Sequence, residues 1–127
     1  MKILVVDDDG FIRELINSML EPAGYAVTMC PGVDAAIAAL DKDSYNLIIT
    51  DLVMPQKTGM DFITHLRRNK VRIPVLAVTG GIENAVDDYI NIGELYADIT
   101  LAKPVSRDRL LASVERLIEE GRQKAKG

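Results

Sequence analysis

The sequence predicts an α/β domain with a parallel sheet that is covered by helices on both faces. Short runs rich in Val, Ile and Leu alternate with segments whose apolar residues recur at helical spacing, and this alternation occurs five times. Strands separated by helices form βαβ units, in which the strands are parallel and buried on both faces. The length of 127 residues suits one domain with a full core.

The first half of the chain is predicted to contain three strands and two helices. The Ile-Leu-Val-Val run at 3–6 favours a strand, and apolar residues at helical spacing predict a helix over 11–20. We expect this helix to end near Pro22, with Gly24 supplying a turn. The elements that follow are a strand at 25–29, an alanine-rich helix at 34–40 and a strand at 46–50.

The second half of the chain is predicted to complete the sheet. A helix with one apolar face is expected at 60–68, and a fourth strand at 74–78. A fourth helix is expected at 83–92 and a weak fifth strand at 97–101. Ser106 is expected to cap the last helix. The buried stripe of that helix is predicted to be Leu110, Leu111, Val114, Leu117 and Ile118.

Composition limits the classes of function. The net charge is -4 and the pI about 4.9, without the basic face that a nucleic-acid groove needs. No apolar run approaches the ~20 residues of a membrane helix, and no signal peptide is evident. We therefore expect a cytoplasmic protein without direct nucleic-acid or membrane contact. The single cysteine, Cys30, suits a reducing compartment and is expected to be structural.

One domain is expected over residues 1–121, followed by a short basic tail at 122–127. No linker, repeat or low-complexity segment divides the chain. The expectation is therefore a stand-alone domain that carries no output domain of its own.

Acidic residues follow two of the predicted strands. Asp7, Asp8 and Asp9 come directly after the first strand, and Asp51 follows the third. Ligands of open parallel sheets bind beyond the carboxyl ends of the strands, where the strand order reverses. If the order is 2-1-3-4-5, these acids converge, and a cation such as Mg²⁺ would offset their repulsion. Asp9 precedes Gly10 and a helix, which favours a helix cap for this residue.

Two further strand ends carry polar side chains. Thr79 ends the fourth strand, and Lys103 follows the fifth. Singly, each has an ordinary interpretation as a strand-end hydroxyl and a surface lysine. Together with the acids they indicate a phosphoryl-transfer site. A carboxylate would attack, a metal and the ammonium would neutralise charge, and the hydroxyl would hydrogen-bond a phosphoryl oxygen.

Four motifs resemble those of the receiver domains of two-component response regulators, in particular single-domain, chemotaxis-regulator-like members. The motifs are ILVVDDD, DLVMPQKTG, VTGG and AKP, each at a predicted strand end and in the family's order. The resemblance extends over essentially the whole chain. It implies a flavodoxin-like, doubly wound (βα)5 fold with strand order 2-1-3-4-5.

The resemblance also implies roles for the acidic residues. Asp51 matches the phosphoacceptor. Asp8, Asp51 and the backbone carbonyl of Val53 match the Mg²⁺ ligands, and Asp7 would act through water or by supporting the ligands. The implied protein is a signalling domain rather than a conventional enzyme. It would catalyse its own phosphotransfer and slow dephosphorylation.

The remaining implied roles concern phosphoryl binding and switching. Thr79, Gly80 and Lys103 match the residues that hold the phosphoryl group, with a cis peptide between Lys103 and Pro104. The implied donor is a sensor histidine kinase or a histidine phosphotransfer protein. The signal would reach a separate protein target through the fourth helix, fifth strand and fifth helix. The oligomeric state is expected to be a monomer or a phosphorylation-dependent dimer.

Some positions depart from the family pattern. Thr100 stands at a switch position where the family often has Tyr or Phe, and Tyr96 is a candidate substitute. The stretch from 79 to 103 is longer than usual. Val53 and Gly81 occupy the two positions that tune hydrolysis in the family.

Two alternative functions are weighed against the receiver. A haloacid-dehalogenase-type phosphatase would use Asp7 as nucleophile and Asp9 as acid, but the chain is short for that family and Asp51 would be unexplained. A pseudo-receiver would bind partners without phosphate turnover. The intact acids, Thr79 and Lys103 argue against it.

Overall fold

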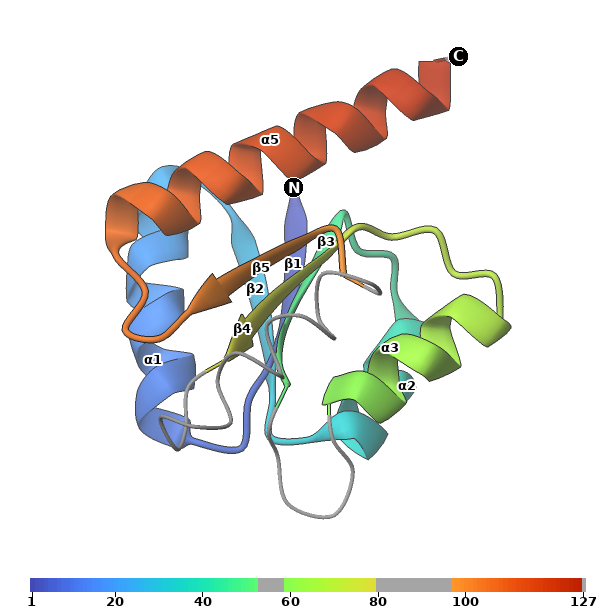
Figure 1. Cartoon of the computed structure of the whole chain (residues 1–127), viewed down its shortest axis with the longest axis horizontal. Coiled ribbons are helices and arrows are strands. Elements are labelled where there is room, and N and C mark those ends of the chain that lie inside the picture. The colour runs from blue at the N-terminus through green and yellow to red at the C-terminus, as the bar shows by residue number, and fades with distance from the viewer. Residues whose placement is uncertain (53–58, 80–96, 127) are drawn as a thin grey trace.

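The computed structural model describes residues 1–52, 59–79 and 97–126 (Figure 1). The elements are β1 (Lys2–Val6), α1 (Gly10–Leu20), a short 3-10 helix η1 (Glu21–Ala23), β2 (Ala26–Cys30), α2 (Val33–Lys42), β3 (Leu47–Asp51), α3 (Gly59–Arg68), β4 (Val75–Thr79), β5 (Ile99–Ala102) and α5 (Arg107–Lys126). The helix expected at 83–92 lies outside the described residues. The other expected elements are present, with ends that differ by a few residues.

The five strands form one parallel sheet in the order β2-β1-β3-β4-β5. This confirms the predicted fold class and strand order. Val6 pairs with Thr50 of β3, Asp51 pairs with Val78, and Thr79 pairs with Ala102. Because the strands are parallel and in this register, β1, β3, β4 and β5 finish at the same edge of the sheet (Figure 1).

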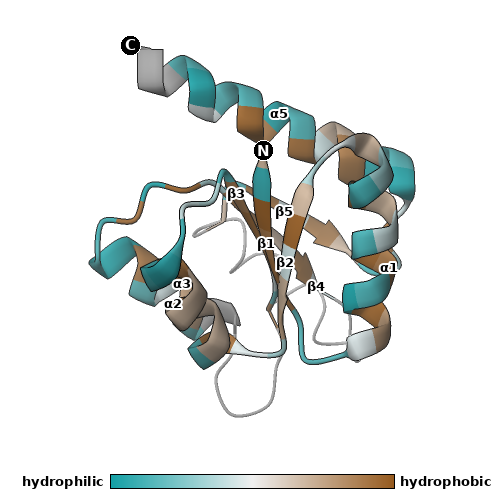
Figure 2. Cartoon of the chain, turned by 180° about the vertical axis from the view of Figure 1, so that it is seen from behind, coloured by the Kyte–Doolittle hydropathy of each residue, from teal (hydrophilic) through white to brown (hydrophobic). Residues whose placement is uncertain are grey.

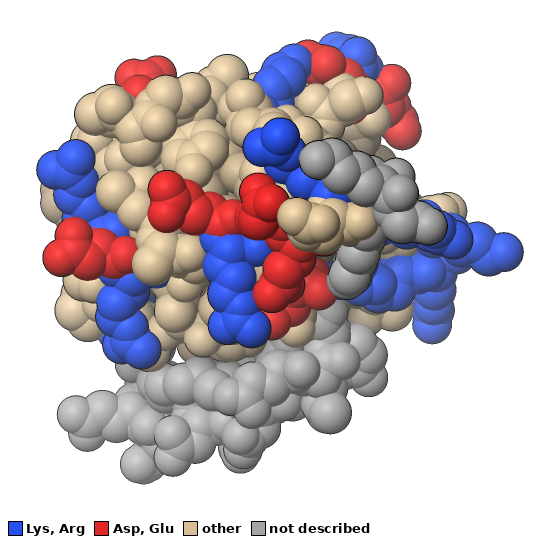
Figure 3. Space-filling view, turned by 90° about the horizontal axis from the view of Figure 1, so that it is seen from above, with Lys and Arg blue, Asp and Glu red and all other residues tan. Residues whose placement is uncertain are grey.

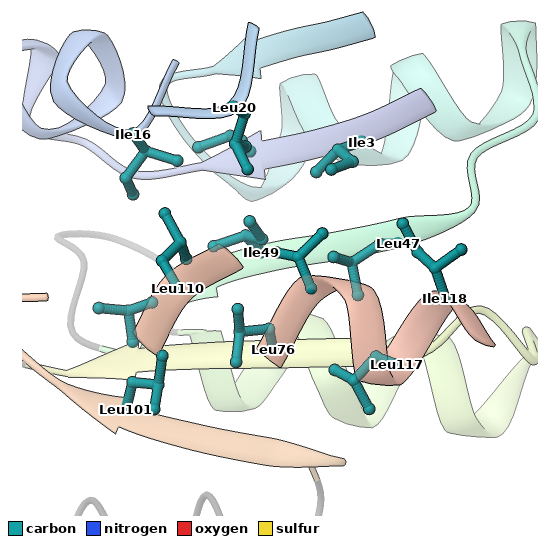
Figure 4. Packing of buried hydrophobic residues seen from close by; sticks show 13 residues of the cluster. Ile3, Ile16, Leu20, Leu47, Ile49, Leu76, Leu101, Leu110, Leu117 and Ile118 are labelled. Atoms are coloured by element: carbon teal, nitrogen blue, oxygen red, sulfur yellow. The ribbon is translucent and has the colours of Figure 1, made fainter. Parts of the chain in front are cut away.

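Helices cover the sheet on both faces. On one face, α1 and α5 pack over strand residues such as Ile3 and Leu76, and Ile16 of α1 and Leu110 of α5 belong to the same buried cluster (Figure 4). On the other face, α2 and α3 pack over alternate strand residues, with Phe62 fully buried. Most strand residues are apolar, and polar residues lie on the outer sides of the helices (Figure 2).

Helix α1 begins and ends close to where the sequence predicted. The Asp9 carboxylate accepts a hydrogen bond from the backbone N–H of Phe11 at 2.9 Å, which confirms the predicted cap. At the other end, Pro22 lies in η1, and Gly24 adopts a left-handed φ of 97°. Glycine adopts this conformation without a steric penalty, so the chain turns there into β2.

The last helix, α5, begins after Ser106, whose hydroxyl accepts a hydrogen bond from the backbone N–H of Arg109 at 3.2 Å. Its predicted stripe is confirmed, with Leu111 partly buried and the other members buried. Residues 122–126, expected as a tail, continue this helix.

Lys, Arg, Asp and Glu side chains are interspersed on the face of the molecule that carries α5 (Figure 3). Exposed ion pairs join Arg116 to Glu120 and Arg122 to Glu119. Such pairs contribute little stability. The buried stripe of apolar residues therefore does most to hold α5 against the sheet.

Within the ranges that the structure describes, the helices are too short or too polar to traverse a bilayer.

The cap of α1 gives the first testable prediction. Replacing Asp9 by Ala removes the acceptor for the Phe11 N–H, and we expect the free energy of unfolding to fall by about 1 kcal/mol. Urea unfolding of the Mg²⁺-free protein measures the change. Asp9→Ser, which retains a capping oxygen, is the matched control and should remain near the wild type. Equal stability of the Ala and wild-type proteins would contradict the assignment.

Candidate functional site

Three carboxylates meet where the strands end. Asp7 follows β1 directly and is 2% exposed, and Asp51 is the last residue of β3 and is 5% exposed. Asp8 is exposed beside them. Carboxylate oxygens of the three residues all lie within 4.8 Å of one another. The predicted convergence of these acids is confirmed, and it follows from the neighbouring positions of β1 and β3.

Lys103 brings a positive charge to the same edge. Its Nζ donates hydrogen bonds to Oδ2 of Asp7 at 3.0 Å and to Oδ2 of Asp51 at 3.2 Å. The lysine follows β5, and its backbone N–H donates to the carbonyl of Thr79 at 2.7 Å. The peptide between Lys103 and Pro104 is cis, as the resemblance implied. The Lys103 ammonium thus links the carboxylate of Asp7, which follows β1, to that of Asp51, which ends β3.

The protonation of Lys103 depends on two opposing effects. Burial disfavours the ammonium and by itself would lower the pKa of Lys103. The hydrogen bond that Lys103 donates to Asp7 and the charges of Asp51 and Asp7 outweigh burial, and the pKa of Lys103 is raised above its ordinary value. The side chain therefore carries its positive charge at neutral pH.

Thr79 contributes a hydroxyl at the end of β4. It is 1% exposed, and its Oγ1 has no hydrogen-bond partner among the residues that the structure describes. Buried polar groups are nearly always paired, because an unpaired one loses its hydration without compensation. The Thr79 hydroxyl is therefore available to a ligand at this edge. Thr100 of β5 likewise has a buried Oγ1 without a partner.

The donor set at this edge fits a small, hard cation. Among the described residues, three carboxylates gather here and one ammonium contacts two of them, so the acids outnumber their lysine partner. Carboxylate oxygens are ligands that Mg²⁺ prefers, and Mg²⁺ commonly takes one or two of them and retains several waters. An exposed Asp8 beside two buried acids leaves the solvent side open to such a hydrated ion.

The other predicted site residues are not part of this described cluster. Asp9 caps α1, as predicted. Val53, Gly80, Gly81 and Tyr96 lie outside the described residues.

Cys30 has the structural role that the sequence predicted, and His65 is exposed on α3. Cys30 is buried, and burial raises the pKa of its thiol although the Arg13 charge acts in the opposite direction. Cys30 is therefore a protonated, structural thiol at neutral pH.

Arg13 is a residue of the site that the sequence interpretation missed. Its Nη1 donates a hydrogen bond to the backbone carbonyl of Asp7 at 2.7 Å. The available signal was its position four residues after the capping Asp9, one helical turn beyond the acidic segment.

The family was identified by comparison of the sequence with known domains. A family model described as the response regulator receiver domain matches residues 3–115. The chain belongs to this family. Receiver domains are signalling domains that are phosphorylated on an aspartate, use Mg²⁺ in an acidic pocket, and interact with histidine kinases and downstream effectors.

A curated relative of this receiver domain is the transcriptional regulatory protein FixJ of Bradyrhizobium diazoefficiens. The two are 31% identical over 124 residues, which cover 98% of this chain and 60% of FixJ. A second relative, the transcriptional regulatory protein PmrA of Pectobacterium parmentieri, is 34% identical, with 93% of this chain and 52% of PmrA covered. This receiver domain thus spans little more than half the length of these relatives.

Solved receiver structures have the same fold. A response regulator receiver domain from Clostridium thermocellum matches with a TM-score of 0.84 and 27% identity, over 99% of this chain and 98% of that one. The response regulator TrrA of Thermotoga maritima, solved in complex with Mg²⁺-BeF, matches with a TM-score of 0.79 and 28% identity. That match covers 91% of this chain and 97% of TrrA.

The raised pKa of Lys103 predicts the pH dependence of stability in this receiver domain. A folded chain that binds the lysine proton more tightly gains stability below the unfolded pKa of about 10.4, and loses it as the pH rises from there through the raised folded value. Urea unfolding between pH 9 and pH 11.5, in EDTA, should show this loss. Lys103→Met should flatten the alkaline decline, and an equally steep decline in that variant would refute the assignment.

Proposed function

We propose that this receiver domain accepts a phosphoryl group on Asp51 in a Mg²⁺-dependent reaction, from a phosphohistidine of a sensor histidine kinase or phosphotransfer protein. The observation that carries the proposal is the meeting of Asp51 with Asp7, Asp8 and Lys103 at one edge of the sheet. An acceptor carboxylate needs positive charge beside it, since the incoming phosphoryl group is itself negative.

Asp7 is a less suitable acceptor than Asp51. Both oxygens of Asp7 already accept hydrogen bonds, Oδ1 from the backbone N–H of Asp9 at 2.9 Å and Oδ2 from Lys103. These bonds favour a role in which Asp7 orients Lys103 and supports the cation through water. They also weigh against the phosphatase alternative, in which Asp7 is the nucleophile and Asp9, here a helix cap, is the acid.

The proposed transfer is a nucleophilic substitution at phosphorus. An Asp51 oxygen attacks the phosphorus atom, the P–N bond to the donor imidazole breaks, and the imidazole keeps the electron pair and takes a proton from solvent. Lys103 neutralises charge on the phosphoryl oxygens, and the unpaired Thr79 hydroxyl donates a hydrogen bond to one of them. In the proposed hydrolysis, water attacks phosphorus, the P–O bond to Asp51 breaks, and inorganic phosphate and a proton are released as the Asp51 carboxylate is regenerated.

Asp8, Asp51 and the carbonyl of Val53 are the proposed Mg²⁺ ligands, with Val53 outside the described residues. Bound Mg²⁺ supplies charge neutralisation between the acids and the phosphoryl oxygens. Support comes from the oxygen ligands gathered here and from the likeness to TrrA, which was solved with Mg²⁺-BeF.

The proposed output is a change of the surface formed by the expected fourth helix, β5 and α5, read by a separate protein target. Gly80 is assigned with Thr79 and Lys103 to phosphoryl binding, although it lies outside the described residues. Thr100 occupies the switch position on β5, where its unpaired hydroxyl marks a site able to change partners. A cytoplasmic location, stand-alone action and a monomer or phosphorylation-dependent dimer remain part of this proposal.

Mg²⁺ binding separates the roles of two neighbouring acids. Asp8→Ala should abolish detectable binding, because Asp8 is a proposed ligand, whereas Asp9→Ala should bind nearly as the wild type does. Titration with MgCl2, followed by backbone amide NMR shifts, measures both. Equal losses in the two variants would show that the acids have been misassigned.

The aspartate that becomes phosphorylated distinguishes the receiver mechanism from the phosphatase mechanism. Incubation with a small phosphodonor and Mg²⁺, then borohydride trapping and peptide mapping, should place the acyl phosphate on Asp51. Asp51→Asn should lose the label, because an amide is a far weaker nucleophile than a carboxylate. Label on Asp7, or undiminished labelling of the Asn variant, would refute the mechanism. Release of phosphate without a trapped aspartate in the wild type would also count against it.

A further inference from the structure

The Arg13 side chain makes a contact that neither its helix nor the core requires. Arg13 lies in the first part of α1 and is half-buried. Its guanidinium reaches back past the start of the helix and donates to the Asp7 carbonyl at 2.7 Å. That carbonyl belongs to the peptide group that joins Asp7 to Asp8. The contact therefore fixes the peptide from which the Asp8 side chain projects.

Backbone hydrogen bonds also hold the acidic segment, residues 7–9, on either side of Asp8. The Asp7 N–H donates to the carbonyl of Cys30 at 3.1 Å, which ties the segment to the end of β2. The Asp9 carbonyl accepts the backbone N–H of Arg13 at 3.0 Å. Arg13 thus engages the segment twice, through its side chain before Asp8 and through its backbone after it. Within the described part of the chain, no hydrogen bond holds the Asp8 carboxylate itself.

We propose that Arg13 is a positioning residue for the metal site, which holds the Asp7–Asp8 peptide so that the Asp8 carboxylate faces Asp7 and Asp51. The inference rests on the proposed Mg²⁺ site. Groups behind the metal ligands commonly set ligand direction, and their loss costs about 10–100-fold in metal affinity. Arg13 suits this role because a planar guanidinium donates in fixed directions.

Gly10 gives independent support for this geometry. A Cβ built on Gly10 would lie 3.3 Å from Nη2 of Arg13, closer than most Cβ contacts in proteins. The absence of a side chain at Gly10 leaves room for the guanidinium against the first turn of α1. Adding a methyl group should therefore displace the guanidinium slightly, while Ala itself is a better helix former than Gly.

A purely electrostatic role for Arg13 predicts the opposite change in Mg²⁺ affinity when its charge is removed. Arg13 forms no ion pair among the residues that the structure describes, but its positive charge lies near the acidic site. If charge alone mattered, Arg13→Met would remove a repulsion and strengthen Mg²⁺ binding, and Arg13→Lys would change little. If position matters, both variants weaken binding, because neither retains the guanidinium fork.

The test compares Mg²⁺ affinities of the wild type and of Arg13→Met, Arg13→Lys, Gly10→Ala and Glu14→Gln. Both Arg13 variants should raise the Mg²⁺ dissociation constant about 10-fold, measured by amide NMR titration. Gly10→Ala should raise it less, while urea unfolding shows its stability unchanged or increased. Glu14, exposed on the same helix, is the matched control and should leave both quantities unchanged.

The kinetics of phosphorylation supply a second measurement. With a small phosphodonor, the Arg13 variants should need about 10-fold more Mg²⁺ for the half-maximal rate, and their rate at saturating Mg²⁺ should stay near that of the wild type. Wild-type affinity in both Arg13 variants, or tighter binding in Arg13→Met, would overturn the positioning role while leaving the proposed function intact. A wild type that binds no Mg²⁺ would overturn the proposed function and this inference with it.

Discussion

The two hydrogen bonds of Lys103 to Asp7 and Asp51 are the interaction on which the site depends. Buried carboxylates held this close repel one another, and desolvation makes each negative charge more costly. A single ammonium that contacts both offsets part of the repulsion, and it does so from a strand end remote in sequence. The proposed Mg²⁺ would offset the negative charge that the lysine leaves. Asp51 therefore takes part both in the ion pairs that hold the site together and in the proposed metal binding.

The sheet makes this arrangement possible because its register is fixed from both sides. Alternate residues of β1 enter different cores: Ile3 packs with α1 and α5, whereas Leu4 packs with α2 and α3. The same alternation continues through β3, so neither strand can rotate or shift without exposing apolar surface. The buried sheet thus carries the acids at its edge.

Much of this could be predicted from the sequence because the signals are local. Apolar runs predicted the strands, and acids placed directly after them predicted the site, since parallel strands deliver their ends to one edge. Asp9 and Ser106 were identified as caps from residue type and position alone. Element ends shifted by a few residues, because pairing with neighbouring strands and packing of helices set the boundaries rather than local preference.

The features that could not be predicted depend on contacts between distant or weakly specific groups. The position of Arg13, one helical turn after Asp9, is visible in the sequence, but its contact is not, because its partner is a backbone carbonyl. Likewise, the sequence does not reveal that the hydroxyls of Thr79 and Thr100 are buried without a hydrogen-bond partner among the described residues. The residues at 122–126 appeared as a tail by composition, yet they continue a helix that is anchored by the stripe preceding them.

The pairing of β1 with two neighbours has a consequence for how the site forms. A slip of one residue in β1 would exchange its two faces between the cores, and it would also draw Asp7 away from the level of Asp51. Such a misaligned state loses apolar packing on both sides of the sheet at once. The chain therefore has little access to a compact state that keeps its core but lacks the assembled acids. Correct packing of the sheet therefore ensures that the acids of the site are brought together.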